Sequence, residues 1–451
     1  MEKPKINPSI FRAYDVRGVY GSDLTEEIMQ RIGNCFAGDI AARKIVLGMD
    51  GRVSGPSLKK SFIKGVTEAG KDVIDVGVVP RGACLYLGWK TGLPSAYITA
   101  SHLTKDWNGV KFSDKEGVEF FEEDNNRIRD KVLGGEYHTA KNRGKAEAAD
   151  SLQGYKKFIL SRIKKSSKPL KVVIDSGNGT GGIAAPGLFR ELGFSVKEIF
   201  TEVDGNFPNR SSEIEEKSLG ELRRNMKGND VGIAYDGDSD RMALMDEKGR
   251  LLDPELISHI ILQELVKSEK GPIIANVECL KIMDEIARKY GREIFRIRVG
   301  NSFLVREVKE RKACFGVERS GHFCIPSIIP MDDGIAASLY AASALSRTGK
   351  KLSQIVDELP KYPFERVKVS CDDGKKFAVI ESLKKRLSKT YERVNTIDGI
   401  RVDFEYGWVL IRASNTGPVI RVSAETDNEE KLKKIIRQFL GTLKEEIEKG
   451  R

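Results

Sequence analysis

The chain has 451 residues, of which 40% are hydrophobic and 31% charged, an ordinary balance for a globular protein of three or four domains. Its formal charge is +10, but Lys and Arg alternate with acidic residues instead of forming a basic arm, which argues against nucleic acid as the partner. No apolar run reaches the ~18 residues of a membrane span, so we expect no membrane association.

The N-terminal stretch of residues 1–18 lacks the apolar core of a signal peptide. The six cysteines are scattered, with no CxxC pair and no histidine at metal-ligand spacing. Such cysteines are typical of buried thiols in a reducing compartment. We therefore expect a cytoplasmic protein.

Strands and helices alternate along the first three quarters of the chain, which predicts an α/β fold built from βαβ units. The first block holds a helix that Thr25 caps and a strand that ends at Ile98. Two further blocks of similar length follow, and the pattern predicts three similar mixed α/β domains, over residues 1–150, 151–253 and 254–362.

The second block begins with a glycine-rich stretch in which Gly177, Gly179 and Gly182 match G-x-G-x-x-G after a strand. This pattern occurs in dinucleotide-binding folds. A lone match also arises in any tight strand-to-helix turn, and we favour that simpler interpretation. After residue 362 the pattern changes to one helix, several short strands and a final amphipathic helix, which predicts a smaller α+β domain over 363–451.

Ser101 and His102 lie where the strand ending at Ile98 runs into a loop, and Lys111 follows after an Asn108-Gly109 turn. A serine hydroxyl becomes a useful nucleophile when a base, a cation or a metal lies near it. The stretch supplies an imidazole and an ammonium group, but a Ser-His pair is also common in plain turns. The remaining motifs decide between these interpretations.

Asp236, Asp238 and Asp240 alternate in the loop DGDSDR between two strand-like segments. Three such carboxylates suit one hard cation, Mg²⁺ or Ca²⁺. An EF-hand is excluded because Arg241 occupies its glycine position and the flanks predict strands. A solvated acidic turn is the alternative.

Two later loops carry groups that suit a phosphosugar. The stretch GVERSGH, residues 316–322, offers hydrogen-bonding groups for sugar hydroxyls. The stretch RASNTGP, residues 412–418, with Arg421 beyond it, offers guanidinium forks and small donors for a phosphate. Together, the four loops indicate phosphoryl transfer on a phosphosugar, with the non-reacting phosphate bound apart from the reacting centre.

These motifs resemble those of the α-D-phosphohexomutase superfamily, in the family's order and across essentially the whole chain. The stretch FRAYDVRG, residues 11–18, is similar to the N-terminal motif of the phosphomannomutase/phosphoglucomutase branch. The resemblance implies three related α/β domains and a fourth domain like the TATA-binding protein, arranged around a central cleft. It also implies that the glycine-rich stretch is no nucleotide site.

The resemblance further implies a mechanism in which phosphorylated Ser101 exchanges its phosphoryl group with a hexose phosphate through a 1,6-bisphosphate, which also serves as activator. Mg²⁺ would be held by the Ser101 phosphate and the three aspartates. The implied catalytic residues are Ser101, His102, Lys111, Arg241, Arg17 and Tyr14, and the implied substrate-binding residues are Glu318, Ser320, His322, Arg412, Ser414, Asn415, Thr416 and Arg421. Contacts to the 3- and 4-hydroxyls alone would admit both glucose and mannose phosphates.

Several positions depart from the family pattern. Leu103-Thr104 replaces Asn-Pro in the serine loop, which predicts a looser loop, and Ser239 replaces a glycine in the metal loop. Val317 and Arg319 stand where Gly and Gln are frequent, and we consider Arg319 as a source of positive charge for the substrate. Asn301 and Glu278 align with a cleft histidine and a lysine of the branch.

These departures leave the sugar open. We expect phosphomannomutase/phosphoglucomutase activity, with phosphopentomutase or phosphoglucosamine mutase as alternatives within the class. An inactive phosphosugar-binding homologue is the alternative outside it. The chain would act as a monomer or homo-oligomer.

Overall fold

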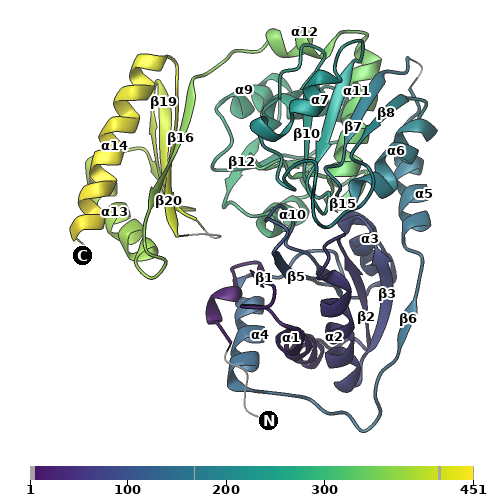
Figure 1. Cartoon of the computed structure of the whole chain (residues 1–451). Coiled ribbons are helices and arrows are strands. Elements are labelled where there is room, and N and C mark those ends of the chain that lie inside the picture. The colour runs from purple at the N-terminus through teal and green to yellow at the C-terminus, as the bar shows by residue number, and fades with distance from the viewer. Residues whose placement is uncertain (1–5, 167, 415–417, 450–451) are drawn as a thin grey trace.

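The computed structural model describes residues 6–166, 168–414 and 418–449. Four β-sheets follow one another along the chain. In Figure 1 the first three lie close together, and the C-terminal sheet with its two helices, drawn in light green and yellow, stands to one side. This confirms the predicted class of three mixed α/β units followed by an α+β unit.

The first sheet has six strands: β1 (Asp15–Val19), β2 (Lys44–Met49), β3 (Asp72–Val78), β4 (Ser95–Ile98), β5 (Trp107–Ser113) and β6 (Ala146–Ala148). Their order is β1-β5-β4-β2-β3-β6. The second sheet has four strands in the order β10-β9-β7-β8: β7 (Lys171–Asp175), β8 (Ser195–Ile199), β9 (Val231–Tyr235) and β10 (Met242–Asp246). The third has five strands in the order β12-β11-β13-β14-β15: β11 (Ile273–Asn276), β12 (Ile294–Ile297), β13 (Phe315–Val317), β14 (Phe323–Ile325) and β15 (Ile329–Asp332).

One pattern recurs in these three sheets. A first strand lies between two parallel neighbours, and the later of these neighbours pairs antiparallel with the strand that follows it. The recurring sets are β3-β2-β4-β5, β8-β7-β9-β10 and β12-β11-β13-β14. The loop between the last two strands of each set therefore has an equivalent position in all three units.

Helices cover the three sheets. They are α1 (Glu26–Asp39), α2 (Gly55–Glu68), α3 (Arg81–Thr91), α4 (Glu122–Gly134), α5 (Leu152–Arg162), α6 (Gly181–Glu191), α7 (Gly220–Arg224), α8 (Pro254–Leu265), α9 (Ile282–Lys289), α10 (Asn301–Glu310), α11 (Gly334–Thr348) and α12 (Leu352–Asp357), with short 3₁₀ turns at Pro8–Ile10 and Glu216–Ser218. Thr25 caps α1 as predicted, since its side chain accepts a hydrogen bond from the Ile28 amide. Asp333 caps α11 through the Ala336 amide.

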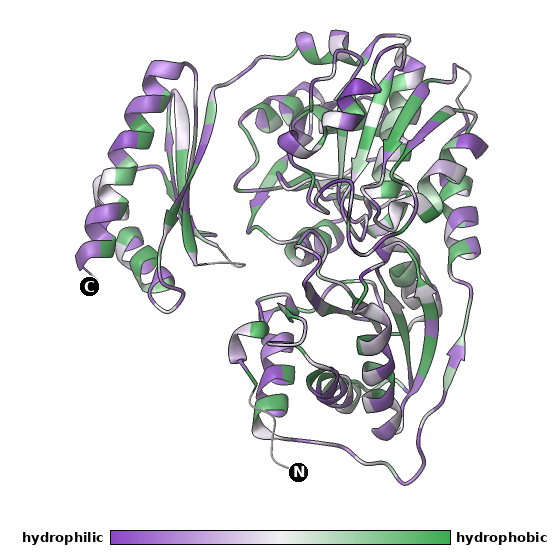
Figure 2. Ribbon diagram, in the orientation of Figure 1, coloured by the Kyte–Doolittle hydropathy of each residue, from purple (hydrophilic) through white to green (hydrophobic). Residues whose placement is uncertain are grey.

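The fourth sheet is entirely antiparallel, in the order β16-β20-β19-β18-β17. Its strands are β16 (Phe364–Ser370), β17 (Val394–Asn395), β18 (Ile400–Phe404), β19 (Gly407–Ala413) and β20 (Val419–Thr426), and its helices are α13 (Lys376–Thr390) and α14 (Glu429–Lys449). The final helix α14 is amphipathic as predicted, with Leu432, Ile435, Ile436, Phe439 and Leu443 buried. In Figure 2 hydrophobic and hydrophilic stretches alternate along it.

The largest hydrophobic core extends across unit boundaries, and two smaller cores each belong to one unit. One large core joins the second and third sheets to the back of α3, and separate cores fill the space under α1, α2 and α4 and under α13 and α14. The six cysteines are buried free thiols, as expected. Among the described helices, none combines the length and the hydropathy that a bilayer-spanning segment requires.

Candidate active site

The three equivalent loops of the first three sheets meet at one place. The β4–β5 loop carries Ser101, the β9–β10 loop carries residues 236–241, and the β13–β14 loop carries residues 318–322. Arg241 and His322 form an isolated β-bridge between the last two loops, and the Met242 amide donates to the Gly321 carbonyl at 3.1 Å. Residues far apart in the sequence are thus held in register by backbone contacts.

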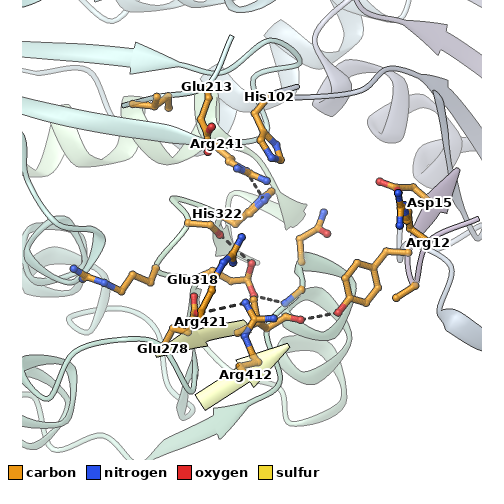
Figure 3. Close-up of a pocket in the computed structure, with 18 of the residues that line it drawn as sticks. Arg12, Asp15, His102, Glu213, Arg241, Glu278, Glu318, His322, Arg412 and Arg421 are labelled. Atoms are coloured by element: carbon orange, nitrogen blue, oxygen red, sulfur yellow. Dashed lines mark hydrogen bonds and ion pairs between the residues drawn. The ribbon is translucent and has the colours of Figure 1, made fainter. Parts of the chain in front are cut away.

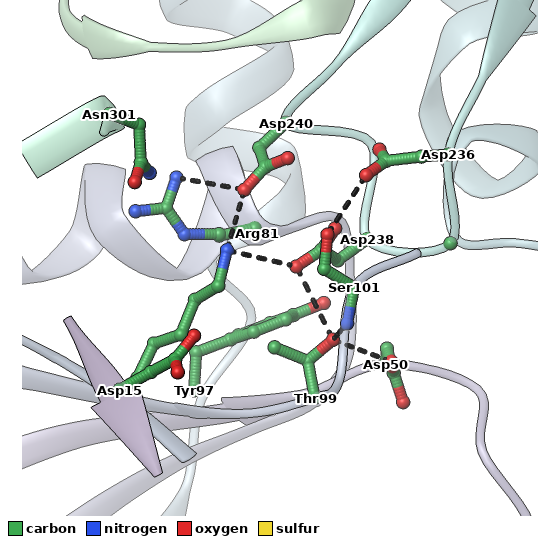
Figure 4. Close-up of polar contacts among 12 residues, drawn as sticks. Asp15, Asp50, Arg81, Tyr97, Thr99, Ser101, Asp236, Asp238, Asp240 and Asn301 are labelled. Atoms are coloured by element: carbon green, nitrogen blue, oxygen red, sulfur yellow. Dashed lines mark hydrogen bonds and ion pairs between the residues drawn. The ribbon is translucent and has the colours of Figure 1, made fainter. Parts of the chain in front are cut away.

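Ser101 is fully buried beside the acidic loop (Figure 4). Its hydroxyl donates to Asp236 Oδ2 at 3.0 Å and lies 3.4 Å from His102 Nδ1. Its backbone is left-handed, with φ 51°, a conformation that costs a serine free energy and is found at functional loops. The Thr99 hydroxyl accepts a hydrogen bond from the Ser101 amide at 2.7 Å and helps to hold this conformation.

Arg52 anchors the serine loop. Its guanidinium, 1% exposed, donates to the carbonyl oxygens of Ser101, Leu103, Thr104 and Trp107 at 2.6–2.9 Å. Its Nε pairs with Asp50 at 3.0 Å. Leu103 and Thr104 are therefore bound through their backbones, and the substitution of Asn-Pro does not leave this loop unanchored.

The three aspartates of the second loop form a compact cluster. Asp236, Asp238 and Asp240 are buried, and each places a carboxylate oxygen within 4.8 Å of the others. Burial, together with the charges of Asp240 and Asp238, raises the pKa of Asp236 well above its usual range. Within the described residues, Asp238 Oδ1 and Asp240 Oδ1 receive no hydrogen bond. A divalent cation would offset the repulsion among the three carboxylates and would bind Asp238 Oδ1 and Asp240 Oδ1. The cluster therefore fits Mg²⁺.

Two buried cations flank this cluster on the side away from Ser101. Lys111 Nζ lies 2.7 Å from Asp240 and 3.5 Å from Asp238, and Arg81 lies 3.5 Å from Asp240. Burial alone would lower the pKa of Lys111, but Asp238, Asp240 and Glu119 outweigh it and raise that pKa. Lys111 is therefore a permanent positive charge.

His102 behaves in the opposite way. Burial, followed by the positive charges of Arg241, Arg17 and Lys111, lowers its pKa well below the usual range. The imidazole is therefore neutral near pH 7. The two basic groups that follow the serine in the sequence thus differ in protonation state.

The glycine-rich stretch of the second unit supports the acidic loop. The Thr180 amide donates to the Gly237 carbonyl at 3.0 Å, and a Cβ on Gly179 would lie 2.7 Å from that same oxygen. Ser239 adopts φ 66°, where a glycine would be unstrained, and its hydroxyl lies 3.3 Å from that of Thr180. Gly179 thus packs against the acidic loop, whereas a Cβ on Gly177 would meet the Arg210 guanidinium and one on Gly182 the Thr201 carbonyl, so close packing accounts for all three glycines.

The third loop places Glu318 in the cavity wall. Glu318 is 2% exposed and accepts hydrogen bonds from the Gly300 amide at 2.6 Å and from the Ser320 hydroxyl at 3.2 Å. His322 contacts Asp332 through Nδ1 at 2.8 Å and accepts from Arg241 Nε through Nε2 at 2.9 Å. This geometry suits the His322 tautomer with its proton on Nδ1.

The fourth sheet supplies the basic end of the site. Arg412 is 3% exposed, Arg421 lies opposite it on β20, and both line the cavity. Ser414 is buried, and its carbonyl accepts a hydrogen bond from Lys376 Nζ at 2.6 Å. Asn415 and Thr416 lie outside the described residues.

Two more basic residues were missed by the sequence reasoning. Arg366 and Lys368 on β16 also line the cavity, and Lys368 pairs with Arg421 in the strand register. Their signal was the alternation of basic residues in FERVKVS, which places both side chains on one face of the strand.

Tyr14 and Arg17 come from the N-terminal strand region. The Tyr14 hydroxyl donates to the Val299 carbonyl of the third unit at 2.8 Å. Arg17 Nε pairs with Asp15 at 2.6 Å, and its Nη1 lies 3.4 Å from the Ala100 carbonyl, next to Ser101. Arg17 therefore lies near the serine, whereas Tyr14 connects two units.

All four units line one cavity of about 360 Å³ (Figure 3). The candidate residues among its lining are Tyr14, Arg17, His102, Lys111, Arg241, Glu318, Ser320, His322, Arg412 and Arg421. The cavity size suits a small polar ligand. His102 and Arg241 line it next to Ser101 and the three aspartates, which are buried and not part of the lining, and Arg412 and Arg421 line it at the fourth sheet.

Two of the departing residues have partners of their own. Arg319 pairs with Glu255 and Asp253, each at 3.0 Å, and its guanidinium stacks 4.3 Å from the Phe364 ring centroid. These carboxylates already balance the charge of Arg319, which argues against the hypothesis that Arg319 supplies positive charge to the substrate. Asn301 donates to Asp332 at 3.2 Å.

Family models match the chain along nearly its full length. They are those of phosphoglucomutase/phosphomannomutase, namely alpha/beta/alpha domain I over residues 8–138, domain II over 150–249, domain III over 253–362 and the C-terminal domain over 367–441.

Individual proteins show the same similarity. A phosphomannomutase/phosphoglucomutase of Pseudomonas aeruginosa is 34% identical over 454 residues, covering 98% of this chain and 96% of that protein. A probable phosphoglucosamine mutase of Methanopyrus kandleri is 31% identical over 450 residues, covering 98% and 99%. The crystal structure of a phosphoglucomutase/phosphomannomutase family protein from Burkholderia thailandensis superposes with a TM-score of 0.88 at 28% identity, covering 98% of both chains.

Proposed function

The chain belongs to the phosphoglucomutase/phosphomannomutase family and is a phosphohexomutase, and from this premise we propose that it interconverts the 1- and 6-phosphates of glucose and mannose through phosphorylated Ser101. One observation carries the proposal. The Ser101 hydroxyl lies 3.0 Å from Asp236 and 3.4 Å from His102, and His102 lines a cavity whose far end is basic. A phosphosugar spanning this cavity would present its free hydroxyl to the serine and its phosphate to the arginines.

In the proposed reaction, the free 6- or 1-hydroxyl of the bound sugar attacks the phosphorus on Ser101. The new bond joins the sugar oxygen to phosphorus, and the bond between phosphorus and Ser101 Oγ breaks. His102, whose Nδ1 lies 3.4 Å from Ser101 Oγ, would pass the proton of the sugar hydroxyl to that leaving oxygen, and permanently charged Lys111 and Arg241 would stabilise negative charge. The resulting 1,6-bisphosphate turns over and returns its other phosphoryl group to Ser101, so the phosphoserine is regenerated.

Asp236, Asp238 and Asp240, with an oxygen of the serine phosphate, would hold Mg²⁺, which neutralises charge on the transferring group. Each of the proposed domains, 1–150, 151–253, 254–362 and 363–451, would then contribute one loop. A hexose 1,6-bisphosphate would activate the enzyme by phosphorylating Ser101.

Glu318 and Ser320 are the proposed ligands of the sugar 3- and 4-hydroxyls, since they adjoin each other in the cavity wall. Glucose and mannose share these hydroxyls and differ at C2, which is the reason to expect both as substrates. Arg412 and Arg421, with Ser414, Asn415 and Thr416, would bind the non-reacting phosphate. Glucosamine phosphate is the second candidate, because the Methanopyrus kandleri relative is named a probable phosphoglucosamine mutase.

The test is turnover of a panel of sugar phosphates by the purified protein with Mg²⁺ and the matching bisphosphate. We expect glucose 1-phosphate and mannose 1-phosphate to be converted at comparable kcat/KM. Conversion of glucosamine 1-phosphate at a rate at least tenfold higher than either would assign the second candidate. Absence of turnover with every sugar would contradict the proposal.

A further inference from the structure

A buried carboxylate lies inside the basic end of the cavity. Glu278 follows β11 in the third unit, is 4% exposed and lines the cavity. Figure 3 shows its side chain beside those of Arg412 and Arg421. The proposed mechanism leaves this carboxylate without a role.

Glu278 bridges two arginines of the fourth sheet. Its Oε1 lies 3.2 Å from Arg412 Nη2, and its Oε2 lies 3.1 Å from Arg366 Nη2. Each guanidinium therefore contacts a separate oxygen of one carboxylate. A phosphate could bind the same two guanidinium groups and, unlike the carboxylate, give each of them two oxygen acceptors.

The protein environment keeps this carboxylate ionised. Burial alone would raise the pKa of Glu278, but Arg412, Arg366 and Arg421 outweigh it and lower that pKa. Burial also raises the cost of leaving Glu278 or Arg412 without a partner, because an uncompensated charge in a buried site is strongly destabilising. The arginines thus already hold one anion when no ligand is bound.

We propose that Glu278 is an internal counter-anion of the phosphate site, which competes with the non-reacting phosphate of the substrate for Arg412 and Arg366. This inference rests on the proposed function, because that function assigns Arg412 to that phosphate; Arg366 lines the same cavity and holds the other oxygen of Glu278. When the phosphate binds, the guanidinium groups exchange the carboxylate for phosphate oxygens. When the bisphosphate releases this end to turn over, Glu278 pairs with both guanidinium groups again.

The same contacts argue against another role. A carboxylate in the cavity could in principle bind the ammonium group of an amino sugar. Both oxygens of Glu278 already contact guanidinium groups from the fourth sheet. An anion that binds these arginines would therefore displace Glu278, whereas an ammonium group would find both carboxylate oxygens occupied.

The test is binding of inorganic phosphate and of glucose 6-phosphate by calorimetry, with all proteins carrying Ser101→Ala so that nothing turns over. Glu278→Gln removes the charge and keeps the shape, Glu278→Asp keeps the charge, and Glu365→Gln makes the same charge change at an exposed neighbour of Arg366. We expect Glu278→Gln to tighten both ligands by about tenfold, because a like charge within contact distance of the phosphate is removed. The dissociation constants of Glu278→Asp and Glu365→Gln should stay within about threefold of those of the parent. A change of that size is smaller than the one expected when an ion pair is lost.

Binding of phosphate to Glu278→Gln that is unchanged or weaker overturns the counter-anion role. If Glu278→Gln is unstable alone, its melting temperature should rise more with phosphate than that of the parent, because the ligand then supplies the missing anion. An equal or smaller rise also overturns the role. A parent that binds no glucose 6-phosphate contradicts the proposed function itself, which separates the two failures.

Discussion

Replacement of Arg52 by lysine probes how the serine loop is positioned. Arg52 uses all five of its N–H donors, one toward Asp50 and four toward the carbonyl oxygens of the loop. A lysine has three donors on one atom and keeps the charge opposite Asp50. At least two of the five acceptors must therefore lose their partner in Arg52→Lys.

The expected effect follows from those two lost hydrogen bonds. A buried carbonyl left unsatisfied costs about 1–3 kcal/mol, so Arg52→Lys should lower the free energy of unfolding by about 2–6 kcal/mol. If the left-handed backbone of Ser101 relaxes and its hydroxyl shifts by about 1 Å, kcat should fall by about 100-fold. KM should change less than about threefold, since the residues proposed to bind the sugar and its phosphate belong to other units.

The assay pairs urea unfolding with steady-state kinetics. Arg292→Lys is the matched control, because Arg292 donates to the carbonyls of Val266 and Glu269 at 3.1 and 2.6 Å and does not line the cavity. The control should lose stability without a comparable loss in kcat. An Arg52→Lys enzyme with kcat within twofold of wild type would refute the positioning argument.

Three further changes test other parts of the account. Asp238→Asn should weaken activation by Mg²⁺ at least tenfold in a metal titration of activity, because one of three carboxylate charges is lost; an unchanged titration would exclude Asp238 as a ligand. Arg319→Ala should leave KM within about twofold, since Glu255 already balances that charge, and a large rise in KM would return Arg319 to the substrate site. Burial lowers the pKa of His259 to about 4 in the folded protein. As the pH falls from about 6.5 to 4, this histidine therefore takes up a proton in the unfolded chain before it does so in the folded one. The free energy of unfolding should fall by up to about 3 kcal/mol over that range. His259→Gln should flatten this pH dependence in urea unfolding curves, and an equally steep curve would contradict the assignment.

Local sequence patterns were sufficient to predict the order of the units and the strands that flank the candidate loops. The alternation DGDSDR between two strand-like segments predicted a strand–loop–strand, and β9 and β10 flank it in the structure. The strand expected to end at Ile98 is β4. These predictions succeeded because strand periodicity and turn residues act over a few neighbouring positions.

Contacts that depend on the tertiary arrangement were not predictable. Nothing in GRVSG shows that Arg52 reaches four carbonyl oxygens about fifty positions later in the chain. Arg319 pairs with Glu255, and Glu278 pairs with Arg412, because the packing of whole units decides where a long side chain points. The roles assigned to the individual site residues remain proposals that rest on the family resemblance and on this geometry.

The most direct measurement is the intact mass of the purified protein before and after incubation with glucose 1,6-bisphosphate and Mg²⁺. Ser101→Ala serves as the control, and peptide mapping locates any added group. The account predicts a gain of one phosphoryl group on Ser101 in the wild-type protein and none in the variant. No gain with glucose, mannose or glucosamine bisphosphates, or an equal gain in Ser101→Ala, would contradict the phosphoserine mechanism.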